Sequence, residues 1–330
     1  MTINSDFLEV KNLNVIYTSD GSVIHAVNNV SFSLKKGETL GLVGETGAGK
    51  TTIARTILRI LPDPPAKVMG GEVLLEGTDL LTLSERDMRT IRGGKISMIF
   101  QDPMTALNPV QKVGDQILEG YLLHNHVDRV TGKERAEEML EMVGIPKERY
   151  GEYPHQFSGG MKQRVVIAMA LACNPALLLA DEPTTALDVT IQAQVLEIIS
   201  SLQEKLQTSM ILITHDLGVV AEVCDTVAVI YAGEIVEMGS KKQLFLNPVH
   251  PYTKGLFASL PSLTGTDKRL HPIEGLPPDP SNLPEGCCFS PRCPHADGHC
   301  RKGKVNFTEI EPGHFCRCHL SDESGGRNDE

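Results

Sequence analysis

The sequence has no excess of positive charge, no long uninterrupted apolar run and few cysteines outside its last part. Its 330 residues include 42 acidic and 31 basic side chains, so the formal net charge is -11. This balance argues against a broad nucleic-acid-binding surface. The longest apolar tract, Val165 to Ala180, is interrupted by Asn174 and Pro175 and is too short to span a bilayer.

The N-terminus lacks a basic start followed by an apolar run, so we expect no signal peptide and a soluble, cytosolic chain. Only Cys173 and Cys224 precede Gly286, whereas six cysteines follow it. A reducing cytosol disfavours stable disulfides. The crowded cysteines are therefore first interpreted as a metal site.

Short apolar runs alternate with helical patterns along most of the chain. Runs such as "ETLGLVG", "ALLLADEP" and "SMILITHD" are uninterrupted, which predicts buried strands of a parallel sheet covered by helices on both faces, an α/β fold. Helical spacing covers Lys50 to Leu61 and Asp188 to Gln207, and residues 103–160 are rich in helix. Thr226 to Gly239 reads as a hairpin turning at Ala232-Gly233. Six prolines among the 26 residues from Pro261 to Gly286 predict an extended linker.

A glycine-rich segment follows the first apolar run and opens a helical pattern. Its sequence, "GETGAGKTT", fits G-x-x-x-x-G-K-[ST] in the context that a phosphate-binding loop requires. Backbone N–H groups of such a loop converge on phosphate oxygens, and the helix dipole adds to the attraction. The lysine reaches the β- and γ-phosphates, and the next hydroxyl serves Mg²⁺. The predicted nucleotide-binding residues are Gly44, Glu45, Thr46, Gly47, Ala48, Gly49, Lys50, Thr51 and Thr52.

A second apolar strand, "LLLADEP", ends in two adjacent carboxylates. Asp181 is a candidate partner for Mg²⁺, and Glu182 is a candidate acceptor of the proton from an attacking water. An acidic pair at a strand end is usually a solvated turn. The phosphate-binding loop upstream favours the catalytic interpretation.

The segment "FSGGMKQR", just before that strand, resembles the signature motif of ATP-binding cassette proteins. In the order of that family, Gln101 in "FQDP" matches the Q-loop and His215 in "THD" matches the switch histidine. The resemblance implies that Gln101 contacts Mg²⁺ and water, that His215 contacts the γ-phosphate, and that Tyr17 stacks on adenine. It also implies that Ser158, Gly159 and Gly160 bind the nucleotide of a partner subunit.

The resemblance covers roughly residues 5–250 and implies a P-loop NTPase (RecA-like) core with an antiparallel β-subdomain and a helical subdomain. The nucleotide-binding domain is expected over residues 1–250, with its helical subdomain at about 103–160. It would pair head-to-tail with a second ATPase, identical or homologous. Mg²⁺ would be held by Thr51, Gln101 and Asp181.

Two later segments, "NPVHPYTKGLFASLP" and "IEGLPPDPSNLPEGCCFSPRC", resemble ATPases of the dipeptide/oligopeptide (and nickel) permease branch. This implies an ATP-hydrolysing subunit of a peptide importer, peripheral on the cytoplasmic side of the membrane. Its partners would be two transmembrane permease subunits and, indirectly, an extracytoplasmic peptide-binding protein, with no nucleic acid. The alternatives are an importer of nickel or another small solute and a soluble, non-transport cassette ATPase.

In that branch four cysteines of the tail are metal ligands, and the matching positions here are Cys287, Cys293, Cys300 and Cys318. Cys288 and Cys316 would be bystanders. Spacings of five, six and seventeen residues leave zinc and an iron–sulfur cluster open, and the resemblance points to [4Fe–4S]. We therefore expect a linker over residues 251–286 and an iron–sulfur tail over 287–330. The tail is expected to be folded by its metal and to lie away from the nucleotide.

Overall fold

The computed structural model describes residues 6–19, 21–185, 187–258 and 273–320, and these fall into two compact units. Of the described residues, the first unit comprises 6–19, 21–33, 40–81, 214–258 and 273–320, and the second comprises 34–39, 82–185 and 187–213. The phosphate-binding loop and the cysteine-rich tail belong to the first unit. The two carboxylates and the signature motif belong to the second.

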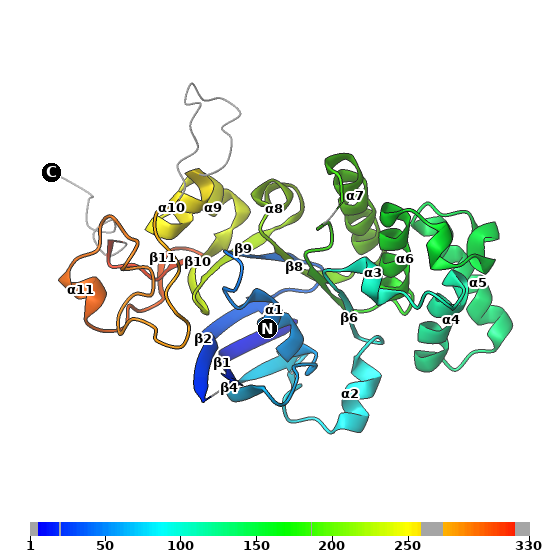
Figure 1. Ribbon diagram of the computed structural model, residues 1–330, viewed down its shortest axis with the longest axis horizontal. Coiled ribbons are helices and arrows are strands. Elements are labelled where there is room, and N and C mark those ends of the chain that lie inside the picture. The colour runs from blue at the N-terminus through cyan, green and yellow to red at the C-terminus, as the bar shows by residue number, and fades with distance from the viewer. Residues whose placement is uncertain (1–5, 20, 186, 259–272, 321–330) are drawn as a thin grey trace, which may run out of the picture. The chain divides into compact units, whose positions relative to one another are not determined.

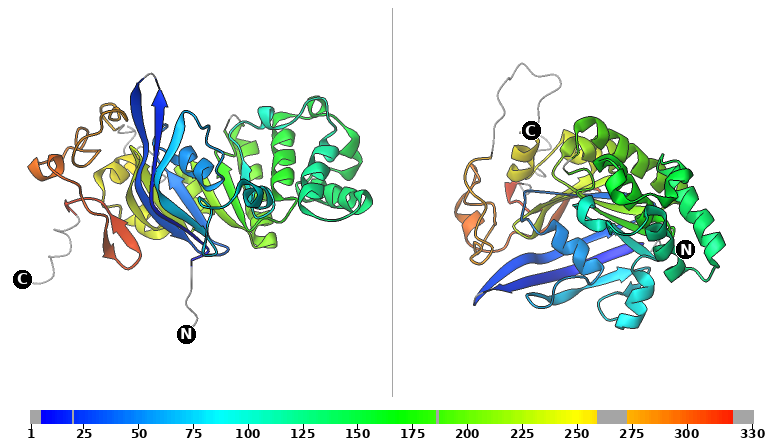
Figure 2. Two further views of the ribbon diagram at one scale, coloured as in Figure 1. Left: turned by 90° about the horizontal axis from the view of Figure 1, so that it is seen from below. Right: turned by 45° about the vertical axis from the view of Figure 1, so that its right-hand side comes forward.

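An antiparallel sheet in the first unit has the strand order β2-β1-β4-β5. Strands β1 and β2 lie side by side as long strands (Figure 2). Buried residues such as Leu8, Val10 and Val15 alternate along β1, which gives this sheet one apolar face. The strands are β1 (Leu8–Ser19), β2 (Ser22–Leu34), β4 (Ala66–Leu75) and β5 (Thr78–Asp79).

The first unit also contains the strand order β11-β12-β10-β9-β3. The parallel pairing of β3 with β9 confirms part of the predicted parallel sheet. The predicted hairpin is confirmed as β9 and β10, whose turn residues Ala232 and Gly233 have φ of 48° and 82°. The strands are β3 (Thr39–Val43), β9 (Thr226–Tyr231), β10 (Glu234–Ser240), β11 (Thr308–Glu311) and β12 (His314–Cys316).

Helix α9 packs against β9 and β10 in the first unit (Figure 1). Helix α1 ends four residues earlier than its apolar spacing predicts, because Arg59 adopts a left-handed φ of 51° that the helix cannot continue. Helix α10 lies within the range predicted as linker. The helices are α1 (Lys50–Ile57), α8 (Leu217–Val223), α9 (Lys241–Leu246), α10 (Pro251–Ala258) and α11 (Gly298–Arg301).

The second unit contains the parallel strands β6, β7 and β8, in the order β8-β7-β6. Every residue of β7 is buried, as its uninterrupted apolar sequence predicts. The predicted helix-rich stretch is present, and α4, α5 and α6 pack against one another (Figure 1). The elements are α2 (Glu85–Ile91), β6 (Ile96–Ile99), α3 (Pro103–Ala106), α4 (Val113–His124), α5 (Arg129–Met142), η1 (Lys147–Gly151), η2 (Pro154–Gln156), α6 (Gly159–Leu171), β7 (Leu177–Asp181), α7 (Val189–Leu206) and β8 (Ser209–Thr214).

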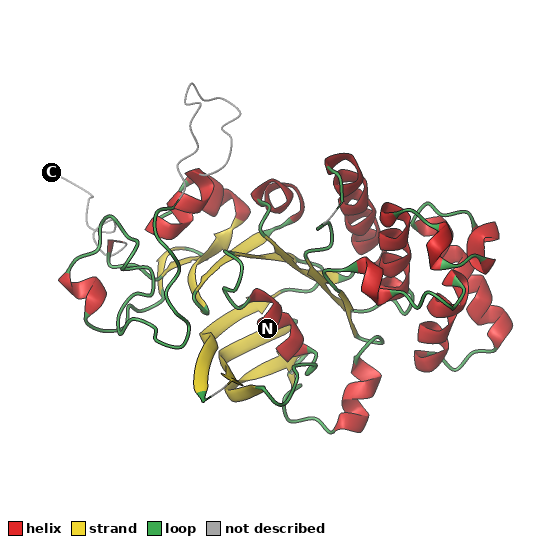
Figure 3. Ribbon diagram, in the orientation of Figure 1, coloured by secondary structure: helices red, strands yellow, loops and turns green. Residues whose placement is uncertain are grey.

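Loops make up most of the described tail (Figure 3), yet the tail is joined to the cassette by strand addition. Strand β12 pairs antiparallel with β10, and β11 pairs with β12. The same two strands contribute a buried pair. His314 Nε2, in β12, lies 2.8 Å from the fully buried carboxylate of Glu237, in β10. Burial favours the protonated carboxyl, but the hydrogen bonds from His314 and from the N–H groups of Val249 and His250 outweigh it and lower the pKa of Glu237. Backbone pairing and this buried pair therefore hold the tail, in addition to any metal.

Across the described ranges, none of the helices combines the length and the apolar character that crossing a membrane requires.

Candidate active site

The phosphate-binding loop connects the buried strand β3 to helix α1 within the first unit. A Cβ atom on Gly44 would lie 2.1 Å from the Ile230 carbonyl oxygen, and one on Gly49 would lie 2.3 Å from that of Ala26. Only glycine allows the backbone to approach this closely. Inside the loop, the Ala48 N–H donates to the Glu45 carbonyl. These contacts fix the curved conformation of the loop, which passes between Ile230 in β9 and Ala26 in β2.

The Lys50 side chain lies inside this curved loop. Lys50 is 6% exposed, and Nζ donates to the carbonyl oxygens of Gly44 and Glu45 at 2.7 and 2.9 Å. The ammonium group therefore lies inside the loop at the start of α1, where the helix dipole is also positive. This places two sources of positive potential at the position predicted to receive phosphates.

Tyr17, predicted to stack on adenine, lies near the end of β1 with its hydroxyl 3.3 Å from Thr52 Oγ1. This contact brings the ring next to the first turn of α1. His215 lies between β8 and α8 and is exposed. The following residue, Asp216, caps α8 by accepting from the N–H groups of Gly218 and Val219.

Glu182 is held directly after β7 in the second unit, next to Asp181, which is 2% exposed. Its φ of 48° is strained for a non-glycine residue, and its N–H donates to the Ile213 carbonyl at 2.8 Å. The carboxylate accepts from Gln101 Nε2 at 2.8 Å and from Thr185 Oγ1 at 2.9 Å. Thus the structure brings two predicted residues, Gln101 and Glu182, into direct contact. The sequence analysis does not identify Thr185 as a hydrogen-bond donor to Glu182, although its position three residues after the carboxylate is a signal that the sequence offers.

The signature segment forms the N-terminus of α6 in the same unit. Ser158 is the N-cap and its hydroxyl accepts from the Met161 N–H at 3.4 Å, while Gly159 and Gly160 begin the helix. A Cβ on Gly160 would lie 2.7 Å from Ile191 in α7, so glycine permits close packing of the two helices there. The first turn of a helix with free space at Gly159 can receive an anion. The segment "ALD" from Ala186 to Asp188 resembles the D-loop of the same family, and Ala186 lies outside the described residues.

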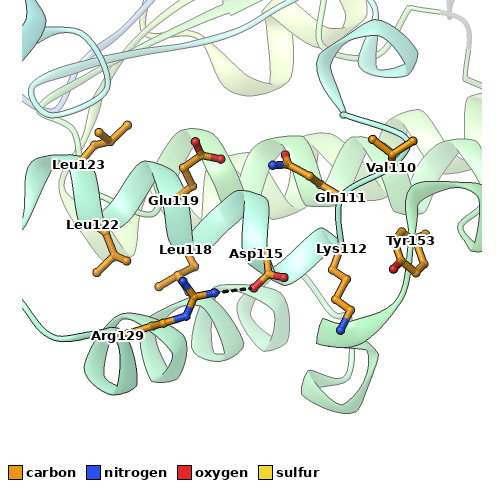
Figure 4. Close-up of a pocket in the computed structure, with 10 residues that line it drawn as sticks. All are labelled: Val110, Gln111, Lys112, Asp115, Leu118, Glu119, Leu122, Leu123, Arg129 and Tyr153. Carbon is orange, nitrogen blue, oxygen red and sulfur yellow. Dashed lines mark ion pairs between the residues drawn. The ribbon is translucent and has the colours of Figure 1, made fainter.

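A groove of about 590 Å³ opens on the second unit and is shown in Figure 4. Its apolar members include Val110 and Leu123, which are 79% and 75% exposed. Arg129 pairs with Asp115 at 3.5 Å in the groove. Its lining residues are Val110, Gln111, Lys112, Asp115, Leu118, Glu119, Leu122, Leu123, Arg129 and Tyr153.

The four cysteines that the resemblance assigns to a metal line one cavity of about 240 Å³ in the tail. The close approach of the segments depends on Gly286, where a Cβ would lie 2.2 Å from the Cys300 carbonyl oxygen. Burial, and then the neighbouring thiols of the set, raise the pKa of Cys287 to about 11. The cavity is lined by Cys287, Cys293, Cys300 and Cys318, with His250, His295, His299 and His319 among the further lining residues.

Cys288 and Cys316 do not line this cavity. Both are buried, and Cys288 hydrogen-bonds Glu234 whereas Cys316 lies in β12. Among the described residues, no three or more His, Cys, Asp or Glu side chains are arranged to hold a single metal ion. The predicted zinc or iron–sulfur centre is thus not shown here, although its four cysteines share one cavity.

The tail is expected to lie away from the nucleotide, yet the structure brings part of it into contact with the phosphate-binding loop. Arg292, in the tail, donates from Nη1 to the Glu45 carboxylate at 2.9 Å. The proline-rich segment also runs beside the loop, because the His25 N–H donates to the Pro280 carbonyl at 2.9 Å. Prolines prevent a helix but do not prevent an extended segment from packing. Pro277, Pro278 and Pro280 share a cavity of about 160 Å³ with Glu45, Thr46, Gly47 and Ala48.

Two known families match this chain. The family described as "ABC transporter" matches residues 27–185, and "Oligopeptide/dipeptide transporter, C-terminal region" matches residues 236–300. The chain is 51% identical to the dipeptide transport ATP-binding protein DppD of Bacillus subtilis, over 96% of this chain and 95% of that protein. It is 54% identical to the oligopeptide transport ATP-binding protein OppD of the same organism, over 92% and 84% respectively.

A similar fold occurs in solved cassette structures. The ATP-binding cassette MJ0796, in a dimeric post-hydrolysis state bound to ADP and Pi, aligns with a TM-score of 0.64 at 28% identity. The alignment covers 71% of this chain and 98% of that one. CbiO1 from Clostridium perfringens, part of the transporter complex cbiONQ, aligns with a TM-score of 0.63 at 27% identity, over 73% of this chain and 91% of that one.

Proposed function

This chain belongs to the ABC transporter family, in the group of dipeptide and oligopeptide transport ATP-binding proteins, and from that premise we propose how its residues bind and use ATP. It is the ATP-binding, ATP-hydrolysing subunit of an importer for dipeptides or oligopeptides. The relatives, named for peptide transport, do not favour nickel import or a non-transport role.

In our proposal ATP lies with its phosphates on the loop that carries Lys50 and with its adenine on Tyr17. The position of the ammonium group inside the loop supports this, because it neutralises phosphate charge where backbone N–H groups also converge. Thr51, Gln101 and Asp181 would hold Mg²⁺, which supplies charge neutralisation on the β- and γ-phosphates. His215 would contact the γ-phosphate.

The observation that carries the catalytic proposal is the carboxylate of Glu182, which accepts hydrogen bonds from Gln101 and Thr185. A carboxylate held in one orientation can accept a proton from a water as that water attacks the γ-phosphate. Gln101, through its side-chain amide, keeps this carboxylate in place. The direct test is a substitution that removes the basicity of this carboxylate and keeps its shape.

Family members work as dimers with transmembrane permease subunits. We place the second ATPase, identical or homologous, head-to-tail with this one, so that Ser158, Gly159 and Gly160 meet the partner's ATP. The complex would lie on the cytoplasmic side of the membrane and receive peptides from an extracytoplasmic binding protein. ATP binding would close the pair, and hydrolysis would reopen it.

Lys50→Ala is expected to raise the Kd for ATP by at least tenfold, because the phosphates lose a buried positive partner. A titration of the full chain with a fluorescent ATP analogue and Mg²⁺ measures this. Lys36→Ala, at an exposed lysine before β3, is the control and should bind as the unchanged chain does. Equal Kd values for Lys50→Ala and the unchanged chain would mean that the phosphates bind elsewhere.

The groove of Figure 4 is our proposed contact for a permease subunit. It combines exposed Val110 and Leu123 with charged side chains, a mixture suited to a short amphipathic segment. It is also connected to the catalytic residues, because the loop that follows Gln101 is tied to α4. Gln116 accepts from the Asn108 N–H at 2.9 Å and donates to the Asn108 carbonyl at 3.0 Å. A segment in the groove would therefore act on the chain that carries Gln101.

Leu123→Asp is expected to reduce recovery of permease subunits with the tagged ATPase about tenfold while ATP binding stays unchanged. The charge would be buried against the docked segment. Co-purification from detergent-solubilised membranes measures assembly. Leu246→Asp is the matched control, because Leu246 is also exposed, at 66%, but lies on α9 in the first unit. Similar loss with both variants would contradict a specific contact at the groove.

For the tail we propose a [4Fe–4S] cluster held by Cys287, Cys293, Cys300 and Cys318, with zinc as the alternative. The shared cavity of about 240 Å³ supports a multi-atom cluster, since side chains holding one ion would have to converge within about 2.3 Å of it. A cluster bound there would tie the cysteine segments together and stabilise the tail.

Cys293→Ser is expected to remove the metal, whereas Cys288→Ser should retain it. Both thiols lie in the same short segment, but only Cys293 lines the cavity. Anaerobic purification should give a brown protein with about four irons per chain, measured by metal analysis. One zinc per chain without colour would reject the cluster and keep the site. Loss of metal in Cys288→Ser with retention in Cys287→Ser would reject the ligand set.

A further inference from the structure

Arg292 is almost completely buried, and its hydrogen bonds join three parts of the first unit. Its side chain is 5% exposed. Nε and Nη2 donate to the carbonyl oxygens of Glu274 and Ile273 at 3.0 and 3.1 Å. Nη1 lies 2.9 Å from Glu45 Oε2 and 3.3 Å from the Tyr231 hydroxyl. A buried guanidinium with this many partners is fixed in position.

Arg292 binds Glu45, which is the first variable position in the sequence of the phosphate-binding loop. Glu45 is held at three points: its carboxylate by Arg292, its N–H by the Tyr252 hydroxyl at 3.0 Å, and its carbonyl by Lys50 Nζ at 2.9 Å. Lys50 and Arg292 therefore act on opposite ends of a single residue. A shift of the Glu45 side chain would be transmitted to a carbonyl that positions the lysine.

The tail segment that carries Arg292 is seated on the loop by aromatic packing. Phe289 lies 5.3 Å from the Tyr231 ring and 5.4 Å from the Tyr252 ring, both of which are buried. The Arg292 guanidinium lies 5.8 Å from the Tyr231 ring centroid. Edge-to-face and cation–π contacts of this kind add to the burial of the rings. Phe289 and Arg292, both between Cys287 and Cys293, thus hold this short segment of the tail against Tyr231 and Tyr252.

We propose that Arg292 is a positioning residue for ATP binding, through which the tail controls the phosphate-binding loop. It fixes Glu45, and it neutralises a carboxylate that would otherwise carry an unpaired negative charge on a loop that receives phosphates. The inference rests on the proposed binding of ATP to this loop. It assigns to the tail an effect on nucleotide affinity that does not require the tail to touch the nucleotide.

The electrostatic part of this role predicts a specific rescue. With Arg292 replaced by Gln, the Glu45 carboxylate is unpaired and repels the triphosphate. Replacing Glu45 by Gln in the same chain removes that repulsion and keeps the size of the side chain. If the tail only stabilised the fold by docking, the added Glu45→Gln change would not restore the affinity for ATP. Rescue therefore separates neutralisation of the Glu45 charge by Arg292 from general stabilisation by the tail.

The experiment measures the Kd for MgATP with a fluorescent analogue on the full chain, and KM and kcat in the reconstituted transporter. Arg292→Gln is expected to raise Kd and KM about tenfold with kcat changed by less than about twofold. Glu45→Gln added to Arg292→Gln should return Kd to within about threefold of the unchanged chain. Arg317→Gln is the matched control, since this second tail arginine bonds the carbonyls of Ile235 and Val305, and its Kd should change by less than about twofold.

An unchanged Kd in Arg292→Gln would overturn the proposal, and so would a raised Kd that Glu45→Gln fails to restore. Lys50→Ala, measured beside these variants, distinguishes failure of the role of Arg292 from failure of the proposed ATP-binding site. If Lys50→Ala weakens binding and Arg292→Gln does not, only the role of Arg292 fails. If Lys50→Ala has no effect, ATP does not bind at this loop and the proposed function itself fails. Limited proteolysis of the tail reports whether Arg292→Gln undocks it, and rescue remains decisive in that case.

Discussion

Glu182→Gln should lower the rate of ATP hydrolysis by about 10²- to 10⁴-fold, the range contributed by a positioned proton acceptor. A glutamine can accept from Gln101 and Thr185 through its amide oxygen, so the geometry seen for Glu182 is preserved. What it lacks is the basicity to take a proton from the attacking water. ATP should still bind and should accumulate in a closed dimer, because closure depends on binding and reopening depends on hydrolysis.

Single-turnover hydrolysis and size-exclusion chromatography with ATP measure the two effects. Glu197→Gln, an exposed glutamate on α7 in the same unit, is the matched control and should hydrolyse ATP normally. Thr185→Ala should fall between the two, since it removes one of the hydrogen bonds to the carboxylate and leaves the base. Rapid turnover by Glu182→Gln would show that another group accepts the proton.

Positions at the ends of strands could be predicted from the sequence. Asp181 and Glu182 come at the end of an uninterrupted apolar run, and the phosphate-binding loop follows another, so the sequence predicts that both lie at the ends of buried strands, as the structure shows. The Gln101–Glu182 contact was not predicted. It is explained by the structure, in which β6 and β7 are parallel neighbours and their carboxyl ends meet at one edge. Their precise catalytic roles stay predictions.

The contact between tail and loop could not be predicted in this way. Arg292 and Glu45 lie 247 residues apart, and nothing periodic in either segment indicates the other. Proline-rich composition suggested a spacer, but composition sets the conformation of a segment and does not say what it packs on. Strands β11 and β12 have four and three residues, too few to show an alternating pattern. The buried pair of Glu237 and His314 could not be predicted either, because a glutamate or a histidine considered singly is expected at the surface.

Ser158→Arg should leave ATP binding to the isolated chain within about twofold and lower hydrolysis in the assembled transporter by about 100-fold or more. Ser158 is the N-cap of α6, and the first turn of this helix offers backbone N–H groups to an anion. In our proposal that anion is the γ-phosphate of the partner's ATP. A long cationic side chain would occupy the space that the phosphate needs, so the dimer could not close.

The substitution also removes an N-cap, which by itself costs about 1 kcal/mol of stability. Ser84→Arg controls for this, because Ser84 caps α2 in the same unit by accepting from the Asp87 N–H at 3.2 Å. It should lose stability to a similar extent and still hydrolyse ATP within about twofold of the unchanged protein. Thermal unfolding and steady-state ATPase rates of both variants give the comparison. Normal hydrolysis by Ser158→Arg in the transporter would refute a signature helix acting across the dimer, since the bulk and charge would then lie away from every ATP. Loss of hydrolysis in both variants would trace the effect to helix stability and equally remove the support for a contact in trans.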